Sequence, residues 1–378
     1  RRVDVLAAAE IEGRERERPR WRASRLAHVD ARGPAAGIAR RRNRARPTTF
    51  GERRAVIAFA AAAQACSGKA DVSSVSDWVQ IYQAMFDAIR QLGGAELVLL
   101  DLLGTLDRGQ FTPHLAVPGD GPLSARAAEL GTEVHAVPLA GNSKLGKARA
   151  ILRSRKALQT LAERLDCQLL VANSMIAGYA AVLAQRPGLA CVWHLHTVMR
   201  SQIARAALRR AAAVIAPSQA GLDAAGLPNG HHISNGVPDR FFAARDPAAG
   251  KSLRTEHDIP AGASVLGIVG RLDPHKGHDV LLASLATSWP TPAPHLVIAG
   301  GELFSEAHGR LGDYGARLRR EVTRLGLEGR VHWLGELDDT ASLLPQLDAL
   351  VVPSIRAESA PRTIAEAQAA SCPVLASA

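Results

Sequence analysis

The sequence of 378 residues has few cysteines and no long hydrophobic stretch, and both absences exclude whole classes of protein. Its four cysteines are scattered and are never spaced as Cys-x-x-Cys. This argues against a disulfide scaffold or a cysteine-based zinc site, and it fits a reducing compartment. No run of 18 or more apolar residues occurs. We therefore expect no membrane-spanning helix.

Two ligand-binding motifs are missing as well. A nicotinamide dehydrogenase needs Gly-x-Gly-x-x-Gly after a strand, with an acidic residue about twenty residues later, and no such motif is present. Asp-x-Asp does not occur anywhere in the chain. The sequence gives no support to a diphosphate held through a metal ion, and we expect neither a metal nor another cofactor.

Positive charge is concentrated at the amino end. The formal net charge is +10, but residues 1–60 hold 16 arginines against 7 acidic residues, so the rest of the chain is close to neutral. The folded body is therefore not expected to bind nucleic acid. A nucleic-acid role through residues 1–54 is an alternative, which deletion of that segment and salt-dependent DNA binding would test.

Residues 1–90 form an atypical segment rich in arginine and alanine, which we expect to be partly disordered. An over-extended start or an out-of-phase reading frame would produce the same composition. Within it, residues 53–66 have the two arginines, apolar run and small-x-small ending of a signal-peptide core. Because they lie more than fifty residues into the chain, we favour a degraded first strand.

From residue 91 onward, short apolar runs alternate with helical patterns, which predicts an α/β fold with parallel sheets covered on both faces. A segment at 237–260, rich in proline, aspartate, alanine and glycine, predicts a linker, so we expect one domain at 91–243 and another at 244–378. The predicted strands are residues 115–117, 134–137, 169–172, 191–193, 213–216, 265–269, 296–299, 331–334, 349–352 and 374–376. The predicted helices are residues 97–107, 123–130, 145–165, 175–184, 199–210, 277–287, 305–325, 340–347 and 362–370.

Two cations flank the turn that follows the apolar run 265–269. Arg271 and Lys276 are five residues apart in a loop bracketed by Gly270 and Gly277. Such a loop lies at the carboxyl end of a strand, where open α/β sheets bind ligands. Arginine supplies a fork and lysine a point charge, so the pair is suited to a diphosphate, although two solvated cations on a surface loop would give the same pattern.

Two carboxylates follow a later strand, with Glu358 on a loop and Glu366 eight residues on. Ser359 and Pro361 predict a helix start between them, which places Glu366 about two turns inside. A rise of about 12 Å over eight helical residues exceeds the separation that glycoside hydrolysis needs, so a glycosidase pair is not expected. Arg362 either adds a phosphate contact or is exposed.

Histidines 194 and 196 follow the apolar run 191–193, and their spacing directs both to one face. No further metal ligands are evident near them. A core or capping role is the alternative for whichever histidine is not used. Gly93 and Gly94, ahead of the predicted helix 97–107, give a weaker signal.

These signals, in this order and spacing, resemble a retaining glycosyltransferase of family 4, over about residues 91–378. The resemblance implies the GT-B fold, with two Rossmann-like, doubly wound parallel-sheet domains facing a cleft. By this resemblance Arg271 and Lys276 bind the donor diphosphate with Gly94 beside it, and His196, with His194 as the fallback, lies near the reacting sugar. The resemblance assigns Glu358 to the donor hexose, and Glu366 and Leu334 to the ribose and nucleotide.

The implied activity is transfer of a hexosyl group from a nucleotide-diphosphate sugar to an acceptor hydroxyl with retention, in polysaccharide or glycolipid biosynthesis. The implied acceptor is a saccharide or a lipid-linked sugar, and the implied location is cytoplasmic, with contact to the inner membrane face. Basic clusters at 144–156 and 200–210 would suit anionic lipid heads, or they are ordinary solvated helix faces.

The sequence departs from the family pattern in two ways. The usual Glu-Gly-Phe-Gly stretch is replaced at residues 358–361 by Glu-Ser-Ala-Pro, which lacks glycines. Against the family length, the chain is expected to be truncated at its carboxyl end and atypical at its amino end. An inactive fragment or pseudo-enzyme with residual nucleotide binding is therefore the alternative.

Overall fold

The computed structural model describes residues 78–83, 92–138, 144–228, 230–243, 253–287, 289, 291–301 and 314–377. The described residues form two compact units. The N-terminal unit holds residues 78–243 together with 357–369, and the C-terminal unit holds 253–356 together with 370–377. Residues 53–66, which we interpret from the sequence as a degraded first strand, lie outside the described residues.

The N-terminal unit is built on a seven-stranded, all-parallel sheet in the order β3-β2-β1-β4-β5-β6-β7. Its strands are β1 (Trp78–Gln83), β2 (Phe111–Val117), β3 (Glu133–Ala136), β4 (Leu169–Ala172), β5 (Ala190–His194), β6 (Ala213–Ala216) and β7 (His231–His232). The first six strands follow the order 3-2-1-4-5-6 of a doubly wound dinucleotide-type fold.

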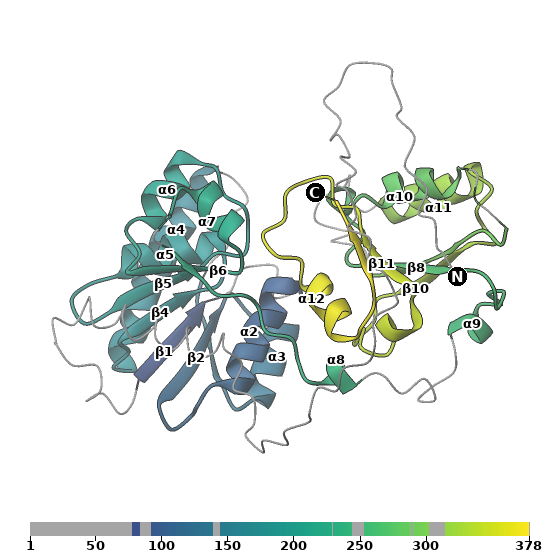
Figure 1. Ribbon diagram of the computed structural model, residues 1–378. Helices are drawn as coiled ribbons and strands as arrows, with labels where there is room; N and C mark the ends of the chain where they lie inside the picture. The colour runs from purple at the N-terminus through teal and green to yellow at the C-terminus, as the bar shows by residue number, and fades with distance from the viewer. Residues whose placement is uncertain are drawn as a thin grey trace, which may run out of the picture. The chain divides into compact units, whose positions relative to one another are not determined.

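Helices cover both faces of this sheet (Figure 1). They are α2 (Gly94–Thr105), α3 (Pro122–Glu129), α4 (Lys144–Arg164), α5 (Met175–Ala184), α6 (Gln202–Leu208) and α7 (Gln219–Ala225), and the short helix α8 (Arg240–Ala243) follows β7 without covering the sheet. One core places α2 and α3 against the sheet through Leu99, Leu103 and Leu123. The other places α4 to α7 on the opposite face, around the fully buried Trp193. Covered on both faces, the inner strands are continuously apolar, as the sequence predicted.

The C-terminal unit repeats the arrangement with a five-stranded parallel sheet in the order β10-β9-β8-β11-β12. Its strands are β8 (Val265–Val269), β9 (His295–Ala299), β10 (Val331–Gly335), β11 (Ala349–Val352) and β12 (Val374–Ala376). Its helices are α9 (Leu253–Glu256), η3 (Pro274–Lys276), α10 (His278–Leu285), α11 (Tyr314–Arg324) and η4 (Leu344–Gln346). Helix α12 (Arg362–Ala369) groups with the N-terminal unit. Leu282 and Leu318 pack α10 and α11 on one face of the sheet.

The expected α/β class with two Rossmann-like parallel-sheet domains is confirmed. Two expectations about single elements are wrong. The predicted helix 340–347 is reduced to the 3₁₀ turn η4, because Pro345 interrupts it. Strand β1 lies at Trp78–Gln83, where no strand was predicted. The short helices α8 and α9 lie within the predicted linker 237–260.

No helix in the described part of the chain combines the length and the apolar character that crossing a bilayer would require.

Candidate active site

In the C-terminal unit the strand order reverses between β8 and β11, and the loops after these two strands meet there. The Ile355 amide donates to the His275 carbonyl at 2.9 Å. Gly277 lies against Pro353, and a Cβ on it would be 2.0 Å from the Pro353 carbonyl oxygen. The reversal point of an open α/β sheet is where such folds bind ligands. The loop with Arg271 and Lys276 lies at that point.

Glycines bring the backbone of neighbouring strand ends into direct contact. Gly270 has φ +148° and Gly300 has φ +156°, and a Cβ on Gly300 would be 1.9 Å from the Gly270 carbonyl oxygen. The Gly270 amide donates to Ala299 at 2.9 Å, and the Gly300 amide donates to Gly335 at 2.7 Å. Only glycine fits such an approach, so the three loops after β8, β9 and β10 form one fixed edge.

Arg271 and Lys276 lie at the two ends of one short, ordered loop. Asp273 caps η3 by accepting from the His275 amide at 2.8 Å, and its carboxylate is 2.9 Å from His275 Nδ1. The Lys276 side chain turns back toward the strand end, with Cε 3.9 Å from the Cβ position of Gly270. Both cations are half-buried. The structure thus brings this predicted pair together beside the glycine edge.

Leu334 is half-buried on β10, next to Gly335 with φ +70°. It therefore lies at the carboxyl end of a strand of the same sheet, two strands from β8.

In the N-terminal unit, the strand order reverses between β1 and β4, and Asn173 connects the groups found there. Asn173, which directly follows β4, is only 2% exposed. Its Nδ2 donates to the Ala95 carbonyl in the first turn of α2 at 2.9 Å, and its Oδ1 is 2.8 Å from His196 Nε2. Since Oδ1 only accepts, His196 donates from Nε2. Gly94, at the start of α2, has open space at its Cβ position. The predicted residues Gly94 and His196 thus lie at one sheet end.

His196 is held neutral by its surroundings. Burial, and secondarily the neighbouring His194, lower the pKa of His196 well below its usual value. The two rings are 4.0 Å apart between centroids. Burial lowers the pKa of His194 to about 4. With Nε2 donating to Asn173, a neutral His196 has Nδ1 as an acceptor.

Glu366 lies on α12, where its environment differs from the sequence-based expectation. It is 6% exposed, and Arg362 Nε donates to its Oε1 at 2.5 Å. A second carboxylate, Asp101 on α2, lies 2.6 Å from Arg362 through Oδ2. Arg362 is therefore buried and bridges two carboxylates, which rules out the alternative of an exposed side chain. Because α12 begins at Arg362, Glu366 lies about one turn inside it and not two.

Glu358 lies on the loop ahead of α12 and is half-buried. Ser359 is 9% exposed, and its hydroxyl is 3.4 Å from that of Ser218. Ser218 itself accepts from the Gly221 amide at 3.2 Å and caps α7. The loop that lacks the family's glycines is thus fixed against α7 by a serine.

Sequence reasoning missed Asn173 and Asp101. An asparagine directly after a predicted strand and ahead of a helix-capping serine was the one available signal for Asn173. No local signal pointed to Asp101, because its partner Arg362 is far along the chain.

Solved structures share this architecture. Alr3699/HepE from Anabaena, solved with UDP and glucose, is 26% identical over 79% of this chain and 80% of that chain, with a TM-score of 0.60. Sucrose-phosphate synthase from Thermosynechococcus elongatus is 19% identical over 79% of this chain and 81% of that chain, also with a TM-score of 0.60. A glycosyltransferase from Rickettsia africae is 18% identical over 79% of each chain, with a TM-score of 0.63. The last two show the fold alone. No curated protein matches the chain.

The two units also match family models. The model of Glycosyltransferase Family 4 matches residues 92–240, and that of Glycosyl transferases group 1 matches residues 251–378. Together with the fold, these matches make the chain a glycosyltransferase of the GT-B type, with a family 4 domain followed by a group 1 domain.

Proposed function

We propose that the chain transfers a hexosyl group from a nucleotide-diphosphate sugar to an acceptor hydroxyl, with retention at the anomeric carbon. The observation that carries the proposal is the loop at the β8–β11 reversal point, where Arg271 and Lys276 flank a short capped turn beside three glycine-lined strand ends. A fork and a point charge on one ordered loop suit the two phosphates of a nucleoside diphosphate. The UDP complexes of the Anabaena relative make UDP the first nucleotide to test.

In the proposed reaction the bond between the anomeric carbon and the diphosphate oxygen breaks, while the acceptor oxygen bonds to the same face of that carbon. The departing diphosphate accepts the acceptor's proton. Arg271 and Lys276 stabilise the negative charge that develops on the leaving group, and no metal ion is required. Such cations act as fixed charges aimed at the position where charge appears.

The remaining site residues receive separate roles in the proposal. Neutral His196, oriented by Asn173, lies near the reacting sugar, and Gly94 leaves room for the donor at the start of α2. Glu358 binds the hexose. Glu366, oriented by Arg362, binds the nucleotide ribose, and Leu334 contacts the nucleotide.

The acceptor is proposed to be a saccharide or a lipid-linked sugar at the inner membrane face, with the chain in the cytoplasm. Support comes from the outer surface of α4, where Arg149, Arg153 and Lys156 are exposed beside Leu152, whose exposed fraction is 56%. Exposed cations with an apolar residue between them suit an anionic bilayer surface. By contrast, Arg205 on α6 is half-buried, and its Nε donates to the Ala225 carbonyl at 3.0 Å.

Cosedimentation tests this contact. The chain should sediment with vesicles that contain anionic lipid and should remain in solution with purely zwitterionic ones. Replacing Arg149, Arg153 and Lys156 with glutamine should abolish the difference. Equal sedimentation of the two proteins would refute the membrane contact without affecting the proposal for the donor.

The donor proposal is tested by nucleotide binding. Calorimetry with UDP, GDP and ADP should show saturable binding of at least one nucleotide, and Arg271→Ala should weaken it about tenfold or more, as expected for a charged hydrogen bond. Arg320→Ala, which removes an exposed cation from α11 of the same unit, is the matched control and should leave binding unchanged. Equal affinities for the two variants would overturn the assignment.

The alternative is an inactive member of the same fold that retains nucleotide binding. The replacement of the family's two glycines by Ser359 and Pro361 favours it, because residues with side chains bring the backbone less close to a sugar phosphate. Donor-sugar consumption separates the two. If the wild type consumes donor sugar and His196→Ala does not, the chain is a transferase. If both proteins bind nucleotide and neither consumes donor sugar, the chain is the inactive form.

A further inference from the structure

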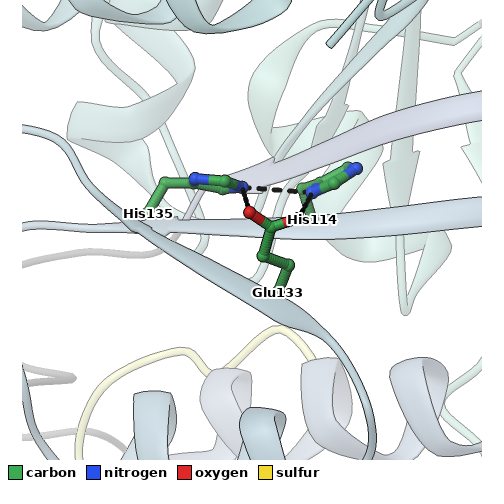
Figure 2. A group of neighbouring side chains, drawn as sticks. All are labelled: His114, Glu133 and His135. Carbon is green, nitrogen blue, oxygen red and sulfur yellow. Dashed lines mark hydrogen bonds and ion pairs between the residues drawn. The ribbon is translucent and has the colours of Figure 1, made fainter.

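Three side chains that the proposed reaction does not use meet at the edge of the N-terminal sheet. Glu133 and His135 are two residues apart on the edge strand β3, so they lie on the same face. His114 on β2 is the direct neighbour of Glu133 in the parallel register. Figure 2 shows the carboxylate and the two rings directed at one another.

The separations of their ligand atoms match the edges of a small coordination polyhedron. His114 Nδ1 is 3.1 Å from His135 Nε2. The Glu133 carboxylate oxygens are 3.4 Å from His114 Nδ1 and 3.6 Å from His135 Nε2. Tetrahedral zinc with bonds of about 2.0–2.1 Å has ligands about 3.3 Å apart. The protein therefore already holds three donors at nearly the spacing that a bound ion requires.

We propose that His114 Nδ1, His135 Nε2 and the Glu133 carboxylate form a binding site for a divalent transition metal ion, with Zn²⁺ as the best fit. Two imidazoles and one carboxylate are a ligand set that zinc uses with water in the fourth position. The Glu133 side chain is 65% exposed, so the site opens to solvent for ion entry and for that water. Within the described residues, this is the one group of three such side chains whose ligand atoms come so close together.

As neutral imidazoles the two histidines can bind a metal ion, once the ring proton of His135 has moved from Nε2 to Nδ1. Burial lowers the pKa of both His114 and His135, and the carboxylate of Glu133 counters this only in part. A neutral imidazole offers a lone pair without first losing a proton. In the metal-free protein, the two facing nitrogens share one hydrogen bond, which a metal ion would replace.

A neighbouring arginine allows a test in which the direction of the change in metal affinity is predicted. Arg164, the last residue of α4, places a guanidinium nitrogen 3.3 Å from His135 Nδ1. Guanidinium only donates, so Nδ1 accepts and the ring proton lies on Nε2. Metal binding at Nε2 moves that proton to Nδ1, where it would face the arginine donors. Arg164 therefore opposes the ion, and its removal should tighten binding.

The other unit contains a matched pair of histidines without a carboxylate. His295 Nδ1 and His332 Nε2, on neighbouring strands β9 and β10, are 2.9 Å apart. The charged groups that act on the pKa of His295 are Arg330 and Arg254, both cationic. The two nitrogens of this pair are about as close as those of His114 and His135, but the neighbouring charges are positive and not negative. We therefore expect the pair to bind Zn²⁺ weakly.

An ion at the proposed site would tie β3, the outermost strand of the sheet, to β2. It would stabilise the folded chain because the ligands are gathered only there. The site therefore has a readout that does not depend on transferase activity.

The experiment uses the full chain, stripped with EDTA and dialysed, and titrated with ZnCl₂ by calorimetry and thermal unfolding. We expect one Zn²⁺ per chain and a rise in melting temperature. Co²⁺ in place of Zn²⁺ should give the intense visible bands of a tetrahedral site. Glu133→Gln and His135→Asn should weaken Zn²⁺ binding about tenfold or more, and Arg164→Gln should strengthen it.

His332→Asn is the control and should leave Zn²⁺ affinity unchanged. The proposal is overturned if the stripped chain binds no Zn²⁺, or if His332→Asn loses as much affinity as His135→Asn. Weaker binding by Arg164→Gln would refute coordination through His135 Nε2.

Discussion

Arg362 and Glu366 form a buried ion pair within a single turn of α12, with Nε 2.5 Å from Oε1. The guanidinium also reaches Asp101 on α2, so one cation joins two helices that are far apart in sequence. A carboxylate proposed to bind the ribose is thus also part of the structural core, and its substitution affects folding as well as binding.

The first prediction separates these two effects. Arg362→Met leaves Glu366 buried without its cation and should lower the free energy of unfolding by about 3–5 kcal/mol. Replacing both residues, as Arg362→Met with Glu366→Leu, should restore part of it, because the buried carboxylate of Glu366 is then gone and only Asp101 is left without its cation. Urea unfolding measures both values.

The exposed pair of Arg186 and Glu163 is the control. Arg186 Nη1 and Glu163 Oε1 are also 2.5 Å apart, but the two side chains are 41% and 56% exposed, respectively. Arg186→Met should therefore change the free energy of unfolding by less than about 1 kcal/mol. Equal effects of the two arginine substitutions would show that burial does not govern the α12 pair.

A second prediction concerns Gly277, which lets the loop that carries Arg271 and Lys276 approach the end of β11. Gly277 and Gly326 have similar left-handed conformations, with φ +73° and +65°. A Cβ on Gly277 would meet the Pro353 carbonyl oxygen at 2.0 Å, whereas one on Gly326 would meet nothing within 4 Å. Gly326→Ala should cost about 1 kcal/mol of backbone strain, and Gly277→Ala should cost ~1–3 kcal/mol more.

Denaturant unfolding gives these differences, and nucleotide calorimetry adds a second readout. Gly277→Ala should also weaken UDP binding, because the collision displaces Lys276. Unchanged nucleotide binding by a folded Gly277→Ala protein would count against the loop as the diphosphate site.

A third prediction tests whether Asn173 acts through His196. Asn173→Ala removes the acceptor of His196 Nε2 and the link to the α2 backbone. It should lower kcat about tenfold, equivalent to ~1.4 kcal/mol of transition-state stabilisation, and leave nucleotide affinity unchanged. Asn173→Asp, which keeps the acceptor, should recover part of kcat. A loss confined to nucleotide affinity would contradict a role near the reacting sugar.

A fourth prediction follows from His278, which is 1% exposed at the start of α10. Burial lowers its pKa to about 4, although the nearby carboxylates of Asp273 and Asp279 raise it in part. In the unfolded chain the pKa is about 6.5. As the pH falls from about 6.5 to 4, the unfolded state takes up the proton first, so stability is lost over this window and is fully present above it.

His278 alone should account for about 3 kcal/mol of that loss. Unfolding measured between pH 4 and pH 7.5 should give a flatter profile for His278→Leu than for the wild type. Parallel profiles would show that His278 is not kept neutral by its surroundings.

The sequence predicted the fold through its continuous apolar strands and missed it where that pattern was broken. Strands β8 and β9 are short apolar runs followed by glycine, and both were found. Residues 78–83 have a glutamine at every third position, so the run looked unlike a continuously apolar, buried parallel strand. The helix predicted at 340–347 failed because the apolar periodicity was given more weight than Pro345.

The candidate site shows a related difference between contacts that are local in the sequence and contacts that are not. The spacing of Arg271 and Lys276 around a glycine-bracketed turn is local, and the structure keeps both on one loop. The partner of His196 and the second partner of Arg362 are not local, since Asn173 is 23 residues from His196 and Asp101 lies on a distant helix. Only the three-dimensional arrangement reveals pairings of that kind.

The position of β1 sets a limit on how the chain can be shortened. It pairs with β2 along its whole length and with β4 over Gln80–Gln83. Cutting the polypeptide beyond Trp78 would split the sheet into two halves, each with an unprotected edge open to other molecules, and such edges promote aggregation. Shortened forms of the protein, whether made by expression or by proteolysis, should therefore keep every residue from Trp78 onward.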